Sequence, residues 1–284
     1  MTTSPLVSER VGQFFIGDDR LEYTAFGGGD RWVVLLHGQL MPRAMHDRLG
    51  RVLAASGLHV VTLDLLGHGR SDRPEDPKEY SMTAWAEQVV ALLDHLGADQ
   101  AVVGGTSLGA NVSLEVAMLA PERVRGLLLE MPVLDNALEA GLLAFAPLLF
   151  LSRYVPPAVT LVAAASRLVP RDHLPALARV VVETLDQRPR SMAAVIHGIF
   201  FGRVAPSSRL RRTITAPALV VGHPRDPIHL AADAEMLADE LPDARHVTAS
   251  SILEWRLHPD RLDGEVLGFA DEVWQDESGQ RRHA

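Results

Sequence analysis

Five short runs rich in Val and Leu are spread along the chain, and each is bounded by Gly, Pro or polar residues. Continuous apolar runs of this length are typical of strands that are buried on both faces, as in a parallel sheet. The predicted strands are 31–36, 59–63, 100–103, 125–129 and 218–221. Two earlier segments, 13–16 and 21–26, flank the turn sequence Gly17-Asp18-Asp19 and are predicted to pair antiparallel.

Helix-length segments lie between these runs. Segment 81–96 has apolar residues at helical spacing (Met82, Trp85, Val89, Leu92, Leu93, Leu96) and is followed by Gly97, which is typical of a helix end. Segments 107–119 and 231–241 show the same periodicity. Strands that alternate with helices predict an α/β fold with a mostly parallel sheet flanked by helices.

The alternation stops between residues 133 and 212. This region is helical in pattern and very apolar, and Pro interrupts it repeatedly. One interpretation is that its helices simply complete the core. Because the region separates two halves of one sheet, we instead predict a core formed by 1–132 and 213–284, with an inserted helical cap over 133–212.

Composition narrows the class of protein. The chain has 284 residues, 47% of them hydrophobic, a net charge of −9 and no Cys. The negative charge argues against nucleic acid as a partner, and the absence of Cys excludes thiol catalysis, disulfides and thiolate metal sites. The N-terminus does not have the pattern of a signal peptide, and the longest apolar run, 141–151, is too short to span a bilayer. We therefore expect a cytoplasmic protein with no membrane span.

Ser107 is the candidate nucleophile. It lies in Gly105-Thr106-Ser107-Leu108-Gly109, after a predicted buried strand and at the start of a predicted helix. A Gly-x-Ser-x-Gly sequence alone is weak evidence, but this strand–turn–helix context is that of a nucleophile elbow. The glycines permit a tight turn that exposes the hydroxyl, and the helix N-terminus favours developing negative charge.

Three further motifs follow other predicted strands: His37-Gly38-Gln39, Asp64-Leu-Leu-Gly-His-Gly-Arg-Ser71, and Gly222-His-Pro-Arg-Asp226. In type and order they resemble the α/β-hydrolase superfamily, in its branch with a serine nucleophile and a helical cap. The resemblance implies that Asp226 is the triad acid and that the backbone N–H groups of Gln39 and Leu108 form the oxyanion hole. It implies a scaffolding role for the Asp64 motif.

The chain departs from this pattern at the triad histidine. The family has it in the loop after the last strand, which here corresponds to 252–254, and none of these residues is His. His258 is the nearest candidate and is taken as the provisional base, although Pro259 places it at the start of the last predicted helix. Further candidates are His229, just after Asp226, and His173 or His197 in the cap. The remaining hypothesis is that no histidine serves Ser107.

The leading hypothesis is hydrolysis of an ester or related acyl compound through an acyl-Ser107 intermediate. A serine nucleophile argues against dehalogenase or epoxide hydrolase chemistry, for which this family uses Asp. Glu130, at a strand end, is predicted either to line the pocket, where desolvation would raise its pKa, or to form a loop salt bridge.

Phe145 and Leu149 of the apolar cap are expected to line a cavity for a hydrophobic small molecule. The same apolar surface is alternatively an interface in a homodimer. The competing functional class is a ligand-binding or non-hydrolytic protein, lyase-like or cyclase-like, that lost the histidine. The sequence implies neither a metal nor a cofactor.

Overall fold

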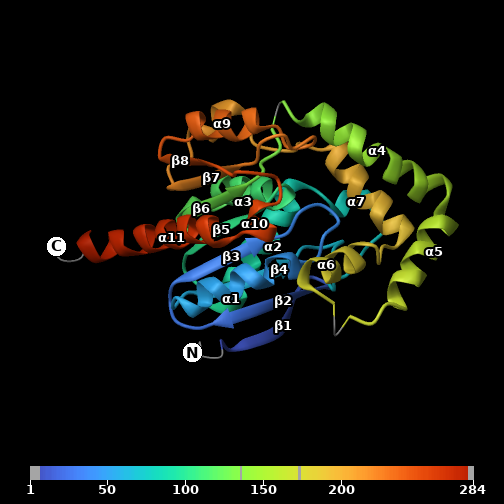
Figure 1. The fold of residues 1–284 in the computed structure, drawn as a ribbon, viewed down its shortest axis with the longest axis horizontal. Helices are drawn as coiled ribbons and strands as arrows, with labels where there is room; N and C mark the ends of the chain where they lie inside the picture. Colours follow the sequence, from blue (N-terminus) through green and yellow to red (C-terminus); the bar gives the residue numbers. More distant parts are fainter. Residues whose placement is uncertain (1–6, 135, 172–173, 281–284) are drawn as a thin grey trace.

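A computed structural model describes residues 7–134, 136–171 and 174–280. Its centre is an eight-stranded sheet with the order β1-β2-β4-β3-β5-β6-β7-β8 (Figure 1). The strands are β1 (Glu9–Ile16), β2 (Asp19–Gly27), β3 (Trp32–Leu36), β4 (His59–Asp64), β5 (Ala101–Thr106), β6 (Val124–Glu130), β7 (Ala218–Gly222) and β8 (Ala244–Thr248). β1 pairs antiparallel with β2, and β2 with β4, whereas the remaining pairs are parallel. The predicted fold class is confirmed.

Helices cover both faces of the sheet, and each face buries its own apolar cluster. On one face, α1 (Asp47–Ala55) and α11 (Asp260–Gln280) pack against β3, β4 and β7. On the other face lie α2 (Met82–Leu96), α3 (Leu108–Leu119) and α9 (Ala231–Glu240). The shorter helices are η1 (Arg43–His46), η2 (Pro77–Glu79), η3 (Pro121–Arg123) and α10 (Glu254–Leu257).

The helix α2 shows how local sequence and burial combine. The Ser81 hydroxyl accepts a hydrogen bond from Ala84 N at 3.0 Å and caps the helix, which ends at Gly97 with φ of 67°. Between these caps, Trp85 and Leu92 are fully buried in the core cluster. The predicted stripe is therefore the face that packs on the sheet.

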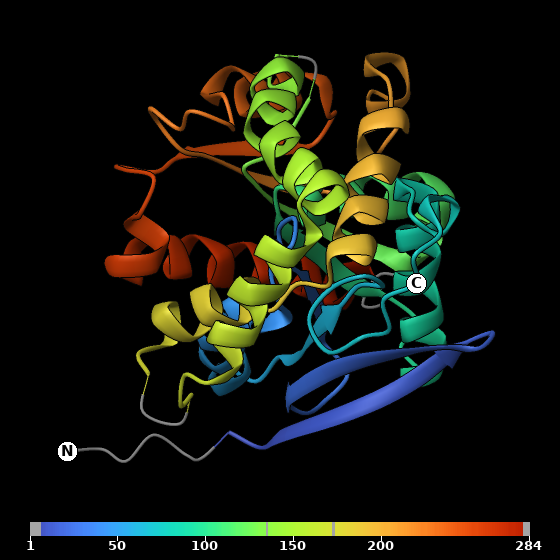
Figure 2. The same cartoon turned by 90° about the vertical axis from the view of Figure 1, so that its right-hand side faces the viewer.

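Between β6 and β7 the chain forms α4 (Leu138–Tyr154), α5 (Pro156–Arg167), α6 (Ala176–Thr184), α7 (Pro189–Phe201) and α8 (Ser208–Arg211), which we call the inserted helices. α4 to α7 form an arch at one side of the sheet (Figures 1 and 2). The fully buried carboxylate of Asp233 in α9 fixes the start of the insertion, accepting from Leu134 N at 2.6 Å and Ala137 N at 3.1 Å. The division of the chain into core and cap at 132/133 and 212/213 stays a prediction.

The inserted helices carry much exposed apolar surface; Leu143 is 79% exposed and Leu161 is 71% exposed. Within the described part of the chain, no single helix is long and apolar enough to cross a membrane. The pair α4 and α5 reaches the required length and composition only together, and it is bent by 101°.

The backbones of β3 and of the segment from β5 to α3 cross at very close range. A Cβ atom added at Gly105 or at Gly109 would lie 2.2 Å from the carbonyl oxygen of Leu36. The obstacle is backbone inside a sheet, so it cannot move aside as a flexible side chain would. Only glycine fits at either position.

We therefore expect Gly109→Ala to lower the free energy of unfolding by about 1–3 kcal/mol, the usual range for overpacking. Gly264→Ala is the matched control, because a Cβ atom there meets nothing within 4 Å on the exposed side of α11. The control is expected to raise stability by about 0.5–1 kcal/mol through helix propensity. Urea unfolding measures both; equal effects of the two substitutions would contradict the close crossing.

Candidate active site

Ser107 lies between the last residue of β5 and the first residue of α3, with φ of 56° and ψ of −110°. A positive φ is unfavourable for a residue with a side chain and persists only where the surroundings enforce it. Here Ser107 N donates to the carbonyl of Glu130 at 2.8 Å, and the Ser107 carbonyl accepts from Asn111 N at 3.1 Å. The serine therefore has the strained strand-to-helix geometry that its sequence context predicts.

The Ser107 hydroxyl is hydrogen-bonded to a histidine, and this histidine is bonded to a carboxylate. His229 Nε2 lies 2.8 Å from Ser107 Oγ, and His229 Nδ1 lies 2.9 Å from Asp226 Oδ2. An ionised carboxylate only accepts, so Nδ1–H donates to Asp226 and the lone pair of Nε2 accepts from the hydroxyl. This is the proton arrangement that makes a serine nucleophilic.

Asp226 and His229 come from one loop, between β7 and α9, and Asp226 also shapes that loop. Its Oδ1 accepts from Ile228 N at 2.8 Å and from His229 N at 2.9 Å, which turns the chain back on itself. Burial raises the pKa of Asp226, but the hydrogen bonds from His229 and Ile228 outweigh it and lower this pKa to about 2. Asp226 is therefore a carboxylate at neutral pH.

The histidine beside Ser107 differs from the provisional base named from the sequence. His258 follows α10, where its backbone N–H donates to Glu254 O at 2.7 Å. Among the described residues, His229 is the histidine hydrogen-bonded to Ser107 Oγ. His197 instead packs against Phe201 in α7, with tilted rings whose centroids are 4.4 Å apart, and His173 lies outside the described residues.

Gln39 and Leu108 line the same cavity as Ser107. Leu108 begins α3, so its backbone N–H lies at a helix N-terminus, where it stabilises negative charge. The next residue after Gln39, Leu40, has φ of 59°, which shows that this loop is tightly constrained. The oxyanion role of the two backbone N–H groups stays a prediction.

The cavity over Ser107 has a volume of about 550 Å³. Its walls come from α3, α4, α7 and the segment 202–207, and they are mainly apolar: Leu142, Phe145, Ile196, Ile199, Phe200, Val204. Phe145 thus lies in the cavity wall, as its place in the apolar insertion predicts. Leu149 is not among the lining residues and packs against the core cluster instead.

Glu130 does not line this cavity; it is buried in an ion pair behind it. Its carboxylate accepts from Thr106 Oγ1 and, at 2.9 Å, from Arg256 Nη2, while His223 Nε2 lies 3.1 Å away. Burial alone would raise the pKa of Glu130, but the Arg256 guanidinium and His223 hold this pKa well below its usual range. The prediction that desolvation raises the pKa of Glu130 is therefore wrong. Arg256, His223 and the Thr106 hydroxyl together lower this pKa by more than burial raises it.

The remaining motif histidines have structural partners. His37 Nε2 accepts from Leu65 N at 3.0 Å, and the His68 ring packs against the His37 ring at 4.6 Å. Asp64 accepts from Arg43 N at 2.6 Å and Arg70 N at 2.9 Å. These bonds fix the loops after β3 and β4.

Comparison with known proteins agrees with this fold. A sequence profile of the alpha/beta hydrolase fold matches residues 31–250, and the chain therefore belongs to this family. A 2-hydroxymuconate semialdehyde hydrolase of Pseudomonas putida is 44% identical over 70 residues, 25% of each chain. Epoxide hydrolase B of Mycobacterium tuberculosis is 38% identical over 96 residues, which are 33% of this chain and 26% of the relative.

These alignments thus span about a quarter of the length of the curated relatives. Among solved structures, an enol-lactonase from Burkholderia xenovorans superposes with a TM-score of 0.74 at 20% identity, covering 91% of this chain and 99% of that one. At this level of identity the likeness concerns the fold.

The Glu130–Arg256 ion pair generates a prediction about stability. Glu130→Gln is expected to lower the free energy of unfolding by about 2–4 kcal/mol at pH 7, because Arg256 loses its buried anion. The folded-state pKa of Glu130 is depressed, so its contribution is complete above the unfolded value of about 4.3. It is lost as the pH falls below that value toward the folded pKa.

Urea titrations of both proteins between pH 7 and pH 3 measure this difference. Glu122→Gln, on the exposed surface, is the control and is expected to leave stability unchanged within about 0.5 kcal/mol. A gap between wild type and Glu130→Gln that stays constant as the pH falls would show that the charge of Glu130 is not the cause.

Proposed function

We propose that the protein hydrolyses an ester or related acyl compound of hydrophobic character, with Ser107 as the nucleophile. The observation that carries this proposal is the continuous hydrogen-bond chain Ser107–His229–Asp226, with distances of 2.8 and 2.9 Å. Relatives named as hydrolases support the reaction class. The proposal keeps the nucleophile and the acid predicted from the sequence and replaces His258 by His229 as the base.

The reaction divides into two half-reactions. Ser107 Oγ attacks the acyl carbon while His229 Nε2 takes its proton, and Asp226 stabilises the resulting imidazolium. The N–H groups of Gln39 and Leu108 hold the oxyanion, which collapses and expels the alcohol as His229 returns the proton. Water then attacks the acyl-Ser107 ester by the same route, and the carboxylic acid and free serine result.

The hypothesis of a non-hydrolytic or ligand-binding protein depended on the absence of a base for Ser107. A histidine within hydrogen-bond distance of the hydroxyl removes the reason to prefer that class. The apolar walls above Ser107 favour an acyl group of modest size with few polar atoms.

The triad assignment predicts which histidine matters for catalysis. Ser107→Ala and His229→Ala are each expected to lower kcat for p-nitrophenyl butyrate by at least about 10³-fold, because triad members act as a unit. His258→Ala is the matched control and should stay within about twofold of wild type, since surface changes away from the site cost little. Stopped-flow or steady-state hydrolysis gives these values; a large loss in His258→Ala with little loss in His229→Ala would overturn the assignment.

The apolar cavity predicts a preference for longer acyl chains. Each buried methylene contributes about 0.8 kcal/mol, so p-nitrophenyl butyrate should exceed the acetate in kcat/KM by roughly tenfold. Phe145→Ser, which places a hydroxyl in the wall of the cavity, should reduce that ratio. Equal kcat/KM values for the two esters in wild type would argue against a hydrophobic acyl site.

A further inference from the structure

A second cavity, of about 580 Å³, lies between the core and the inserted helix α6. Its lining comes from η1, α1, α6 and α10, and it has no residue in common with the lining of the cavity over Ser107. Nothing in the proposed reaction uses it. Its chemistry is also different, because arginine is its most frequent lining residue.

Six arginines line this cavity, against two acidic residues, Asp47 and Glu183. Three of the arginines are committed to carboxylates behind the wall: Arg48 to Asp263 at 2.6 Å, Arg51 to Glu9 at 2.9 Å and Arg256 to Glu130 at 2.9 Å. These ion pairs occupy the three guanidinium groups without a ligand.

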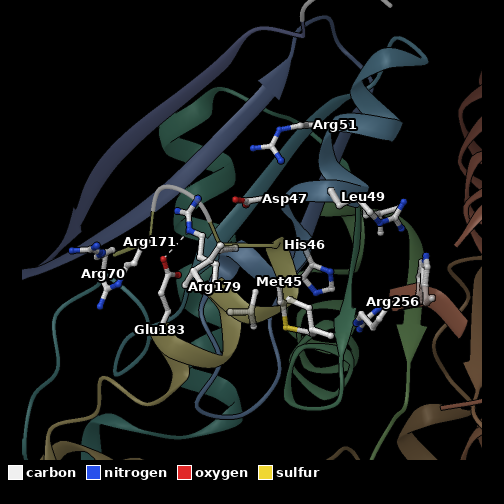
Figure 3. A pocket seen from close by; sticks show the side chains of 16 residues that line it. Met45, His46, Asp47, Leu49, Arg51, Arg70, Arg171, Arg179, Glu183 and Arg256 are labelled. Carbon is white, nitrogen blue, oxygen red and sulfur yellow. Dashed lines mark hydrogen bonds and ion pairs between the residues drawn. The ribbon is translucent and has the colours of Figure 1, made fainter. Parts of the chain in front are cut away.

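The other three, Arg70, Arg171 and Arg179, gather on one side of the cavity (Figure 3). Arg179 is paired with Glu183 at 3.0 Å, and Arg171 reaches Asp186 only at 3.6 Å. The Arg70 guanidinium forms no ion pair with any residue that the structure describes, and its side chain is exposed. Arg70 is therefore the arginine at this side whose guanidinium is available to an anion.

Two acids also line the cavity, Glu183 beside Arg179 and Asp47. Asp47 faces the cavity from α1, and its Oδ1 is buried without a hydrogen-bond partner among the described residues. Burial raises the pKa of Asp47 to about 6, so Asp47 keeps most of its charge at pH 7 and loses it in mildly acidic solution. The apolar side chains of Leu174, Leu177 and Val180, in α6 and the segment before it, line the cavity on the α6 side. Leu49 and Trp255 line it on the side of the core.

We propose that this cavity binds an organic carboxylate with an apolar body. The carboxylate lies against Arg70 and Arg171, because a guanidinium binds a carboxylate through two parallel hydrogen bonds. The apolar body lies along Leu177 and Val180. The site is independent of the proposed hydrolysis, since none of its residues lines the cavity over Ser107.

Calorimetric titration with octanoate tests this proposal, in the Ser107→Ala background so that turnover plays no part. Arg70→Ala is expected to weaken octanoate binding about tenfold and Arg70→Glu further, as expected for loss of one charged hydrogen-bonding group. Arg190→Ala is the matched control: this arginine is exposed, pairs with Glu75 at 3.4 Å and is not part of the lining. It should leave octanoate affinity within about twofold.

A second variant tests the apolar wall. Leu177 is 46% exposed, so Leu177→Asp is expected to fold, and it places a negative charge beside the octanoate chain. Octanoate binding should then be lost. Octanol and inorganic phosphate are the probes for the two halves of the ligand and should each bind much more weakly than octanoate.

Three results would overturn the proposal. The first is octanoate binding that neither Arg70→Ala nor Leu177→Asp weakens, which would place the ligand in the cavity over Ser107. The second is an octanol or phosphate affinity equal to that of octanoate. The third is no octanoate binding by the Ser107→Ala protein.

Discussion

The close crossing of β3 and the turn after β5 is the constraint on which the site depends. The Leu36 carbonyl leaves no room for a Cβ at Gly105 or Gly109, and between these glycines Ser107 takes its strained backbone conformation. The pairing of Thr106 with Glu130 in β5 and β6 holds the turn from the other side. The hydroxyl is thereby presented at the carboxyl-terminal ends of the parallel strands, where the loop after β7 begins. The backbone strain at Ser107, the proposed nucleophile, is maintained by the ordinary packing of a parallel sheet.

Two carboxylates near Ser107 have depressed pKa values for different reasons, and this separates their roles. Asp226 is held ionised by hydrogen bonds from His229 and from its own loop, so it orients the His229 ring. Glu130 is held ionised mainly by Arg256 and makes no contact with the cavity. Arg256 comes from the segment after β8, where the family pattern leads one to expect the histidine. That segment thus supplies a cation to Glu130, and the loop after β7 carries both Asp226 and His229.

Much of the fold was predictable because apolar periodicity reflects burial directly. Strands such as β3 and β7 are buried along most of their length, and a continuous apolar run has few other interpretations. Ser107 was also predictable, since the flanking glycines report a backbone constraint that the structure confirms. Phe145 followed from its place in the inserted helices, but Leu149 did not, because the sequence does not say which side of α4 faces the cavity.

The histidine that contacts Ser107 was harder to predict, for a physical reason. Whether His229 reaches Ser107 depends first on a turn, in which Asp226 accepts from the N–H groups of Ile228 and His229. It also depends on how this turn lies relative to the end of β5, which is more than 100 residues away in the chain. The available signal was the short Asp-Pro-Ile-His sequence, in which the carboxylate and the imidazole are close enough to share one loop. Glu130 was uncertain for a similar reason, since its pKa depends on Arg256, 126 positions away.

The central claim is that His229 forms the hydrogen bond with Asp226 that prepares it to accept a proton from Ser107. Nuclear magnetic resonance of protein with isotope-labelled histidine tests it most directly, through the strongly hydrogen-bonded Nδ1 proton, which resonates far downfield. This resonance is predicted to be present in wild type and in His258→Gln and absent in His229→Gln and Asp226→Asn. Its persistence in His229→Gln, or its loss in His258→Gln, would contradict the account.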